Sequence, residues 1–310
     1  MINKKLKARK AVAFGAVAGL LMGAWSVSSH AQTCTITNWG GGAVNGDSLF
    51  AGSPQEGNAR YAGPCSLAVS LDNDMAYVVD DSPIGEPAYI ARFYFNPNGN
   101  ASADKPMIVF AANEAGDGTG DDVLQVWYNV GAALPDFTPQ ANAITLLIQT
   151  DDGLAQINVT EGVRATGWNS VEIVWGSGAE SDVVLNVNGI NDVVVGGLNT
   201  SSQSIGSAAL GLVGIPGGFS VISDDPLLFD DFDSRRQSRP GRLCRGLTDE
   251  SRTELANIDV LAIFEEVASG GAELAGGVPD FNEDGVVDNV DLLGVFNQVS
   301  GGFGDCEFNS

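Results

Sequence analysis

Short stretches of β-branched and aromatic residues recur through the first two thirds of the chain, separated by Gly, Asn, Asp and Pro. Residues 88–95, 107–110, 123–128 and 143–149 are examples, and residues 182–195 have the composition of a hairpin. Many short strands with turn residues between them are typical of an all-β sandwich. We therefore predict a mainly β fold for this part of the chain.

The stretch 170–175 shows how the predicted sheet is oriented. Val171, Ile173 and Trp175 fall on one face, and Glu172 falls on the other. Alternation with a period of two marks a sheet that has one face in the core and one toward water. We expect Trp175 in the core and Glu172 on the solvent-facing side.

Helical periodicity replaces strand periodicity near the C-terminus. Residues 257–267 and 289–299 align at a constant offset of 32 positions, so we predict a duplicated helix. The second copy has an amphipathic face with the spacing i, i+3, i+4 and i+7, formed by Leu292, Val295, Phe296 and Val299.

These patterns divide the chain into four segments. We predict a signal peptide at residues 1–31, a β-sandwich at 32–233, a linker at 234–243 and a small α-helical domain at 244–310. The linker is polar, basic and interrupted by Pro-Gly, as connections between domains often are.

The first segment has the composition of a secretory signal peptide. Five basic residues lie within positions 4–10, an apolar run follows at 11–25, and Ser29-His30-Ala31 is a small-x-small ending. We expect cleavage near Ala31 and a secreted protein, located in the periplasm, at the cell surface or in the medium. No later stretch approaches the roughly 20 apolar residues of a membrane-spanning helix, so we predict no membrane span.

Charge excludes several classes of function. The net charge is −24, and removal of the five basic signal residues leaves −29. His30 is the only histidine, and Lys105 is the only lysine after position 31. The exported protein therefore cannot form a Ser-His-Asp triad or a histidine-ligated zinc site, and we predict no nucleic-acid partner. A role in solubility and in tolerance of salt explains the acidity of the chain at least as well as any specific function.

An even number of cysteines in an exported chain predicts two disulfides. The cysteines are Cys34, Cys65, Cys244 and Cys306. Three pairings are possible. We favour Cys34 with Cys65 and Cys244 with Cys306, because each bond then closes within one domain.

A twelve-residue acidic loop, residues 280–291, directly precedes the second predicted helix. Calcium takes six to eight oxygen ligands, and such a loop supplies them from alternating positions while a glycine, here Gly285, permits the turn at position 6. The predicted metal ligands are Asp280, Asn282, Asp284, the carbonyl of Val286, Asp288 and Asp291. We therefore predict one Ca²⁺ ion as cofactor; an acidic turn that only caps the helix is the alternative.

The first copy of the repeat does not keep this pattern. Asp259 matches Asp291, but Thr248, Arg252 and Ala256 stand at positions 1, 5 and 9. Arg252 places a positive charge near the ion position. We expect a single calcium site, with the first copy serving as a packing partner.

The duplicated unit, an EF-hand-type loop followed by one helix, resembles a dockerin type I module. The resemblance covers residues 244–306 and implies structural calcium and a cohesin-like partner protein. The family's recognition positions fall here on Asn289 and Val290 and, in the first copy, on Asn257 and Ile258. Val290 and Ile258 depart from the hydroxyl residues that are usual in that family.

Residues 167–175, the hairpin at 186–189 and the closing stretch 229–233 resemble the last strands of a laminin-G-like or concanavalin-like jelly roll. The resemblance implies two antiparallel sheets and binding of a carbohydrate or a protein. An acidic turn at 113–122 is a weaker candidate for a second calcium. The candidates for a sugar-stacking platform are Trp39, Trp127, Trp168 and Trp175.

An enzyme is the main alternative to a binding module. Glucanases of the resembling fold carry Glu-x-Asp-x-x-Glu on one strand, and this motif does not occur here. We therefore assign no catalytic residues and interpret the protein as a non-catalytic module for polysaccharide or for a surface protein. A glycoside hydrolase or lyase that carries a dockerin is one alternative, and a structural cell-surface or matrix protein is another.

Overall fold

All residues that the computed structural model describes belong to one compact unit, Gln32–Ser310. The predicted signal peptide, residues 1–31, lies outside them. The described residues are 34–52, 59–63, 65–114, 122–248, 252, 254–270 and 277–302.

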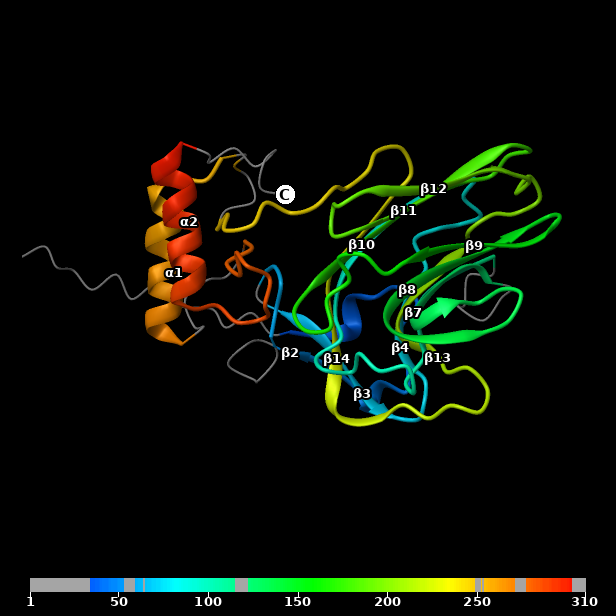
Figure 1. Cartoon of the computed structure of the whole chain (residues 1–310), viewed down its shortest axis with the longest axis horizontal. Helices are drawn as coiled ribbons and strands as arrows, with labels where there is room; N and C mark the ends of the chain where they lie inside the picture. Colours follow the sequence, from blue (N-terminus) through cyan, green and yellow to red (C-terminus); the bar gives the residue numbers. More distant parts are fainter. Residues whose placement is uncertain are drawn as a thin grey trace, which may run out of the picture. The chain divides into compact units, whose positions relative to one another are not determined.

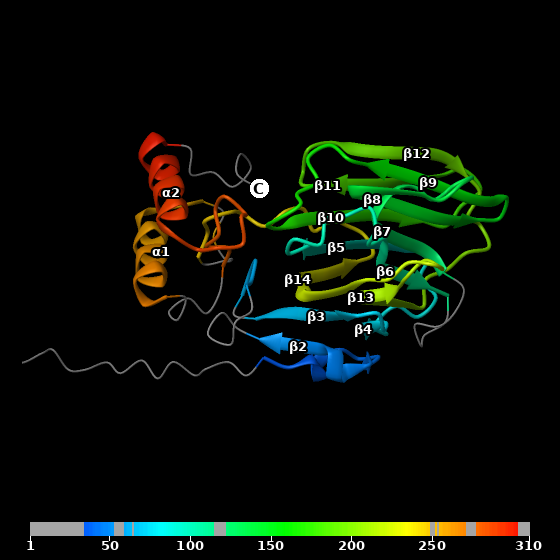
Figure 2. The same cartoon turned by 60° about the horizontal axis from the view of Figure 1, so that its bottom comes forward.

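Two seven-stranded antiparallel sheets form a sandwich (Figures 1 and 2). The first sheet has the spatial order β1 (Ala43–Val44), β4 (Ala76–Asp80), β13 (Ser207–Gly214), β6 (Met107–Asn113), β7 (Asp122–Ala132), β8 (Thr138–Thr150) and β9 (Gly153–Val159). The second has the order β12 (Asp192–Leu198), β11 (Ser181–Val187), β10 (Asn169–Gly176), β5 (Ala88–Asn96), β14 (Ile222–Arg235), β3 (Ser66–Asp72) and β2 (Leu49–Gly52). Two short 3-10 helices, η1 (Ile36–Asn38) and η2 (Gly46–Ser48), flank β1. The predicted mainly β architecture is confirmed.

The main core lies between the two sheets, because alternate side chains of each strand point inward. Phe93 and Phe95 of β5 meet Phe110 of β6 and Tyr128 of β7 across it, with ring centroids 5.4 Å apart for Phe93–Phe110 and 4.9 Å apart for Phe95–Tyr128. All four rings are buried. Burial of each apolar ring contributes roughly 1.5–3 kcal/mol, so this layer is a principal source of stability.

In strand β10, the residues predicted to face the core do so, but the residue predicted to face solvent does not. Val171 and Trp175 are buried in the core. Glu172 was predicted to face solvent, and this is wrong, since its side chain is only 8% exposed. The chain after β14 covers it: the guanidinium of Arg239 donates a hydrogen bond to Glu172, and the backbone N–H of Gly241 donates another at 2.8 Å.

The segment predicted as a linker, residues 234–243, begins inside β14 and then packs on the outer face of the second sheet. Arg239 also pairs with Asp192 of β12 at 2.7 Å, and Arg92 of β5 donates to the carbonyl of Gly241 at 2.7 Å. Its arginines hold it against carboxylates of the sheet. The segment is therefore a packed part of the molecule.

Helices α1 (Asn257–Ser269) and α2 (Asn289–Gly301) lie side by side and each extend two residues beyond the predicted copies (Figure 1). Ile263 and Val295, which are 32 positions apart, are buried together between them. Phe296 was predicted for the buried face, but it is 52% exposed. Val295 takes the inward position, and the next helical residue points roughly 100° away from it. Within the described residues, neither helix has the length and apolar character needed to cross a bilayer.

Cys34 and Cys65 form the disulfide that was favoured from the sequence. The bond ties the segment before η1 to the start of β3. Cys244 also takes part in a disulfide. Its predicted partner, Cys306, lies outside the described residues.

Candidate calcium site and its contact with the sandwich

The predicted calcium loop leads directly into α2, and its last acidic residues begin the helix. Asp288 is the N-cap residue, and its side chain accepts a hydrogen bond from the backbone N–H of Val290 at 2.6 Å. The side chain of Asp291 reaches back to the N–H of Asp288 at 2.8 Å. This reciprocal capping box satisfies two N–H groups that have no partner within the helix.

Two of the predicted ligands, Asp280 and Asp291, are completely buried. Asp280 accepts hydrogen bonds from the backbone N–H groups of Asp284 at 3.2 Å and Gly285 at 2.8 Å. Asp291 accepts one from the N–H of Asn282 at 3.1 Å. The loop backbone is therefore wrapped around two carboxylates that come from its two ends.

These carboxylates have no positively charged partner within the described part of the chain. Burial, together with the negative charges of Asp291 and Asp284, raises the pKa of Asp280 to about 7. Burial also raises the pKa of Asp291. Two buried carboxylates without a countercharge destabilise a fold, and a hard divalent cation removes that cost. The residues present therefore fit calcium.

The remaining predicted ligands lie nearer the surface and are hydrogen-bonded inside the loop. The Asn282 amide donates to Asp284 at 2.9 Å, and Asp284 accepts from the N–H of Val286 at 2.9 Å. Among the described residues, no three His, Cys, Asp or Glu side chains are gathered in the manner of a metal site. The four acidic ligands predicted from the sequence are therefore not gathered into a single coordination site in this structure.

The first repeat shows how the same fold neutralises the equivalent carboxylate without metal. Asp259, the counterpart of Asp291, is also fully buried. Both terminal nitrogens of the Arg252 guanidinium donate hydrogen bonds to Asp259, and the hydroxyl of Thr248 donates another at 2.7 Å. Burial opposes ionisation of Asp259, but the hydrogen bonds from Arg252, Thr248 and the backbone N–H of Ala256 together outweigh it and lower the pKa. An arginine therefore stands in the first repeat where the second has the acidic residue Asp284.

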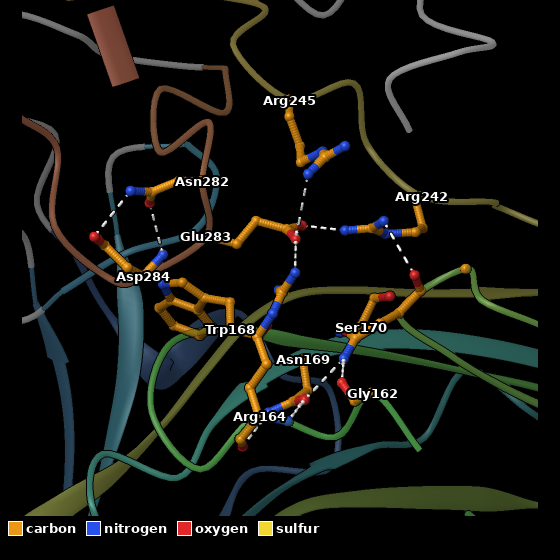
Figure 3. Close-up of polar contacts among 12 residues, drawn as sticks. Gly162, Arg164, Trp168, Asn169, Ser170, Arg242, Arg245, Asn282, Glu283 and Asp284 are labelled. Atoms are coloured by element: carbon orange, nitrogen blue, oxygen red, sulfur yellow. Dashed lines mark hydrogen bonds and ion pairs between the residues drawn. The ribbon is translucent and has the colours of Figure 1, made fainter. Parts of the chain in front are cut away.

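Sequence reasoning missed a further charged residue of the loop, Glu283. Its side chain is 1% exposed and reaches the sandwich, where it forms ion pairs with Arg164 at 2.6 Å and with Arg242 (Figure 3). The hydroxyl of Tyr61 donates a hydrogen bond to it at 2.8 Å. Position 4 of a calcium loop is not a ligand position, so the loop motif contains no signal for this role.

Among the four candidate platform tryptophans, the structure favours Trp127. Trp168 and Trp175 are buried, and Trp39 packs on Phe232 with ring centroids 5.3 Å apart. Trp127, on the outer face of β7, is partly exposed and lies 5.8 Å from the ring of Phe137.

A cleft of about 660 Å³ lies on the same sheet. Gln125 of β7 pairs in register with Leu147 of β8, and Gln149 of β8 pairs with Leu154 of β9. The indole N–H of Trp127 donates to Gln125 at 2.8 Å and so links the ring to the cleft. The cleft is lined by Glu114, Asp122, Gln125, Leu147, Gln149, Leu154, Ser202 and Gln203.

The acidic turn at 113–122 lies mostly outside the described residues, which exclude 115–121. At its ends, the Asn113 amide donates a hydrogen bond to Asp122.

No protein-family model and no curated protein sequence matches this chain. Its fold is similar to solved structures at low identity. An endo-β-1,4-glucuronan lyase from the fungus Trichoderma reesei matches at 14% identity and a TM-score of 0.44, over 66% of this chain and 91% of that one. The alginate lyase AlyC3 matches at 10% identity and 0.37, over 56% and 75%. A botulinum neurotoxin serotype D/C binding domain matches at 12% identity and 0.40, over 58% and 44%.

We predict that Arg252→Leu destabilises the protein by about 1–3 kcal/mol, because it leaves the buried Asp259 carboxylate without its positive partner. Urea unfolding in excess chelator, followed by far-UV circular dichroism, measures the change. Arg235→Leu is the matched control, since it breaks an exposed pair with Asp233 and is expected to cost less than about 1 kcal/mol. Equal losses in the two variants would contradict the role of Arg252.

Proposed function

We propose that this chain is an exported, non-catalytic calcium-binding protein whose dockerin-like helical pair docks onto a partner protein. The main evidence is that the two repeats differ in the countercharge of their buried carboxylates. Asp259 has Arg252 as a built-in cation, whereas Asp280 and Asp291 are buried with no positive side chain beside them among the described residues. A bound Ca²⁺ supplies the missing charge.

Calcium has a structural role in this proposal. The ion neutralises clustered carboxylates, so its binding free energy adds to the stability of the loop and of α2. A ligand that binds only the folded state stabilises it by mass action, by about 2.7 kcal/mol at 100 times its Kd.

The expected calorimetric result is one saturable calcium site in the protein that begins at Gln32, absent from an Asp280→Ala, Asp291→Ala double variant. Chelation is expected to lower the melting temperature of the parent protein by several degrees. An Asp224→Ala, Asp225→Ala variant is the control, because it removes two charges from exposed positions of strand β14. No heat and no stabilisation by calcium in the parent protein would refute the proposal.

The paired helices carry an apolar groove that the core of the unit leaves uncovered. Its volume is about 670 Å³, and Leu261 and Phe264 of α1 match Leu293 and Phe296 of α2 at the repeat offset of 32. All four side chains are at least half exposed. Paired apolar residues at the same positions of both helices are typical of a helix face that binds a partner. The acidity of the chain favours a partner with a basic rim.

The docking proposal is tested with an immobilised type I cohesin domain. Binding is expected in calcium and not in chelator, and a Leu293→Asp, Phe296→Asp variant is expected to lose at least about tenfold in affinity. Ile84→Asp, at an exposed apolar residue of the sandwich, serves as the control. Calcium-independent binding, or binding unaffected by the double substitution, would rule out a cohesin-like partner at this groove.

We further propose that the concanavalin-like sandwich binds a neutral polysaccharide on the outer face of its first sheet. The supporting observation is the partly exposed ring of Trp127 beside a cleft that contains Gln125 and Gln149. An aromatic face stacks on sugar rings, and amides donate to and accept from hydroxyls. Glu114 and Asp122 at the same cleft disfavour anionic chains.

Affinity electrophoresis in gels that contain hydroxyethyl cellulose or xylan tests this site. Trp127→Ala is expected to weaken retardation roughly fivefold or more, as loss of about 1 kcal/mol of ring contact implies. Phe50→Ala, which removes an exposed aromatic ring from β2 of the other sheet, is the control. Equal retardation of the two variants would place the ligand elsewhere. Release of reducing ends during incubation would instead favour a polysaccharide-degrading enzyme.

A further inference from the structure

The tip of the predicted calcium loop is inserted into the sandwich, where Glu283 forms ion pairs with Arg164 and Arg242. Glu283 stands between the predicted ligands Asn282 and Asp284 and has a positive φ of 60°. Its side chain turns away from the loop interior into a polar socket (Figure 3). A left-handed conformation at a glutamate is unfavourable, so surrounding contacts must hold it.

The socket brings several positive charges to one carboxylate. Arg164 comes from the loop before β10, while Arg242 and Arg245 come from the segment after β14, and the distances to Glu283 are 2.6 Å for Arg164 and 3.8 Å for Arg245. The three guanidinium groups and the hydroxyl of Tyr61 supply the countercharge and the hydrogen bond that a buried carboxylate needs. A charged glutamate is therefore stable at this buried position.

The backbone of the loop tip is held as well as the side chain. The N–H of Trp168 donates to the carbonyl of Glu283 at 3.0 Å. Gly167 has a φ of +78°, and a Cβ atom there would lie 2.2 Å from the same carbonyl oxygen, so only glycine allows this approach. Gly167 and Trp168, which directly precede strand β10, therefore fix the position of the loop tip.

The backbone next to Glu283 also contacts Asp280, one of the predicted calcium ligands. The N–H of Gly285, two residues after Glu283, donates to Asp280 at 2.8 Å. The loop conformation that surrounds Asp280 is therefore the conformation that the socket stabilises.

We propose that Glu283 is a positioning residue that couples calcium binding to docking of the loop on the sandwich. Docking orders the loop in advance, so the docked loop binds Ca²⁺ more tightly. By reciprocity, Ca²⁺ tightens the contact between the loop and the residues around Trp168. This inference rests on the proposed calcium site.

The variant Arg164→Gln tests the coupling, because loss of the positive charge and loss of the socket predict opposite changes in calcium affinity. Arg164 lies on the sandwich, is 31% exposed and is not a calcium ligand. Loss of a positive charge near a cation site should by electrostatics alone make calcium bind more tightly. Loss of the socket should make it bind about tenfold more weakly, within the usual range of coupling between sites. We expect the weaker binding, measured by calorimetry on the full exported chain.

Arg235→Gln is the matched control, because it removes the same charge from an exposed pair with Asp233 and leaves the socket intact. Its calcium affinity is expected to equal that of the parent protein. If Arg164→Gln disturbs folding in chelator, Arg242→Gln carries the same test from the other side of the socket. Unchanged or tighter calcium binding in both socket variants overturns the inference.

Hydrogen exchange measures the effect of calcium on the sandwich directly, which a binding affinity does not report. In the parent protein, calcium is expected to slow exchange in residues 164–170 of the sandwich as well as in 280–291. In Glu283→Gln, saturating calcium is expected to protect 280–291 but no longer 164–170. Protection confined to the loop in the parent protein would refute the coupling, whereas absence of any calcium binding in the parent would refute the calcium site itself.

Discussion

Burial of carboxylates in a chain with few positive charges is the constraint on which this structure depends. Each buried acidic side chain needs a countercharge, because an unpaired buried charge is strongly destabilising. Glu266 of α1 has Arg60 at 2.7 Å, Asp259 has Arg252, and Glu283 has its socket. Asp280 and Asp291 form the exception among the described residues. This exception gives the calcium proposal its physical basis.

The same constraint explains why the sandwich and the helical pair form one compact unit. Arginines after β14 pair with carboxylates on the outer face of the second sheet and with the calcium loop. Apolar contacts follow the same path, since Tyr61, Tyr94 and Trp168 of the sandwich pack with Val278 in one cluster. The rings of Tyr61 and Tyr94 are stacked with centroids 3.6 Å apart. The proposed metal ion would therefore act on a surface that both parts share.

Coverage of one sheet also bears on where a ligand can bind. On the second sheet, Glu172 and Arg92 lie beneath the segment that follows β14. On the first sheet, Trp127 and Gln125 remain accessible beside a cleft. A polysaccharide needs contact with exposed rings and amides along a chain of sugars, so the first sheet offers the better surface.

Local periodicity was sufficient to predict the strands and the duplicated helices, because period-two alternation and the 32-residue offset are properties of neighbouring residues. The calcium loop stays a prediction that rests on its ligand spacing. The prediction that the exported protein has no histidine also comes from the sequence, because His30 is the only histidine and lies in the predicted signal peptide. The environment of Glu172, the exposure of Phe296 and the socket of Glu283 could not be predicted in this way. Each depends on residues far apart in the chain, such as Arg239 over Glu172 or Arg164 beside Glu283, and only the tertiary structure brings their charges together.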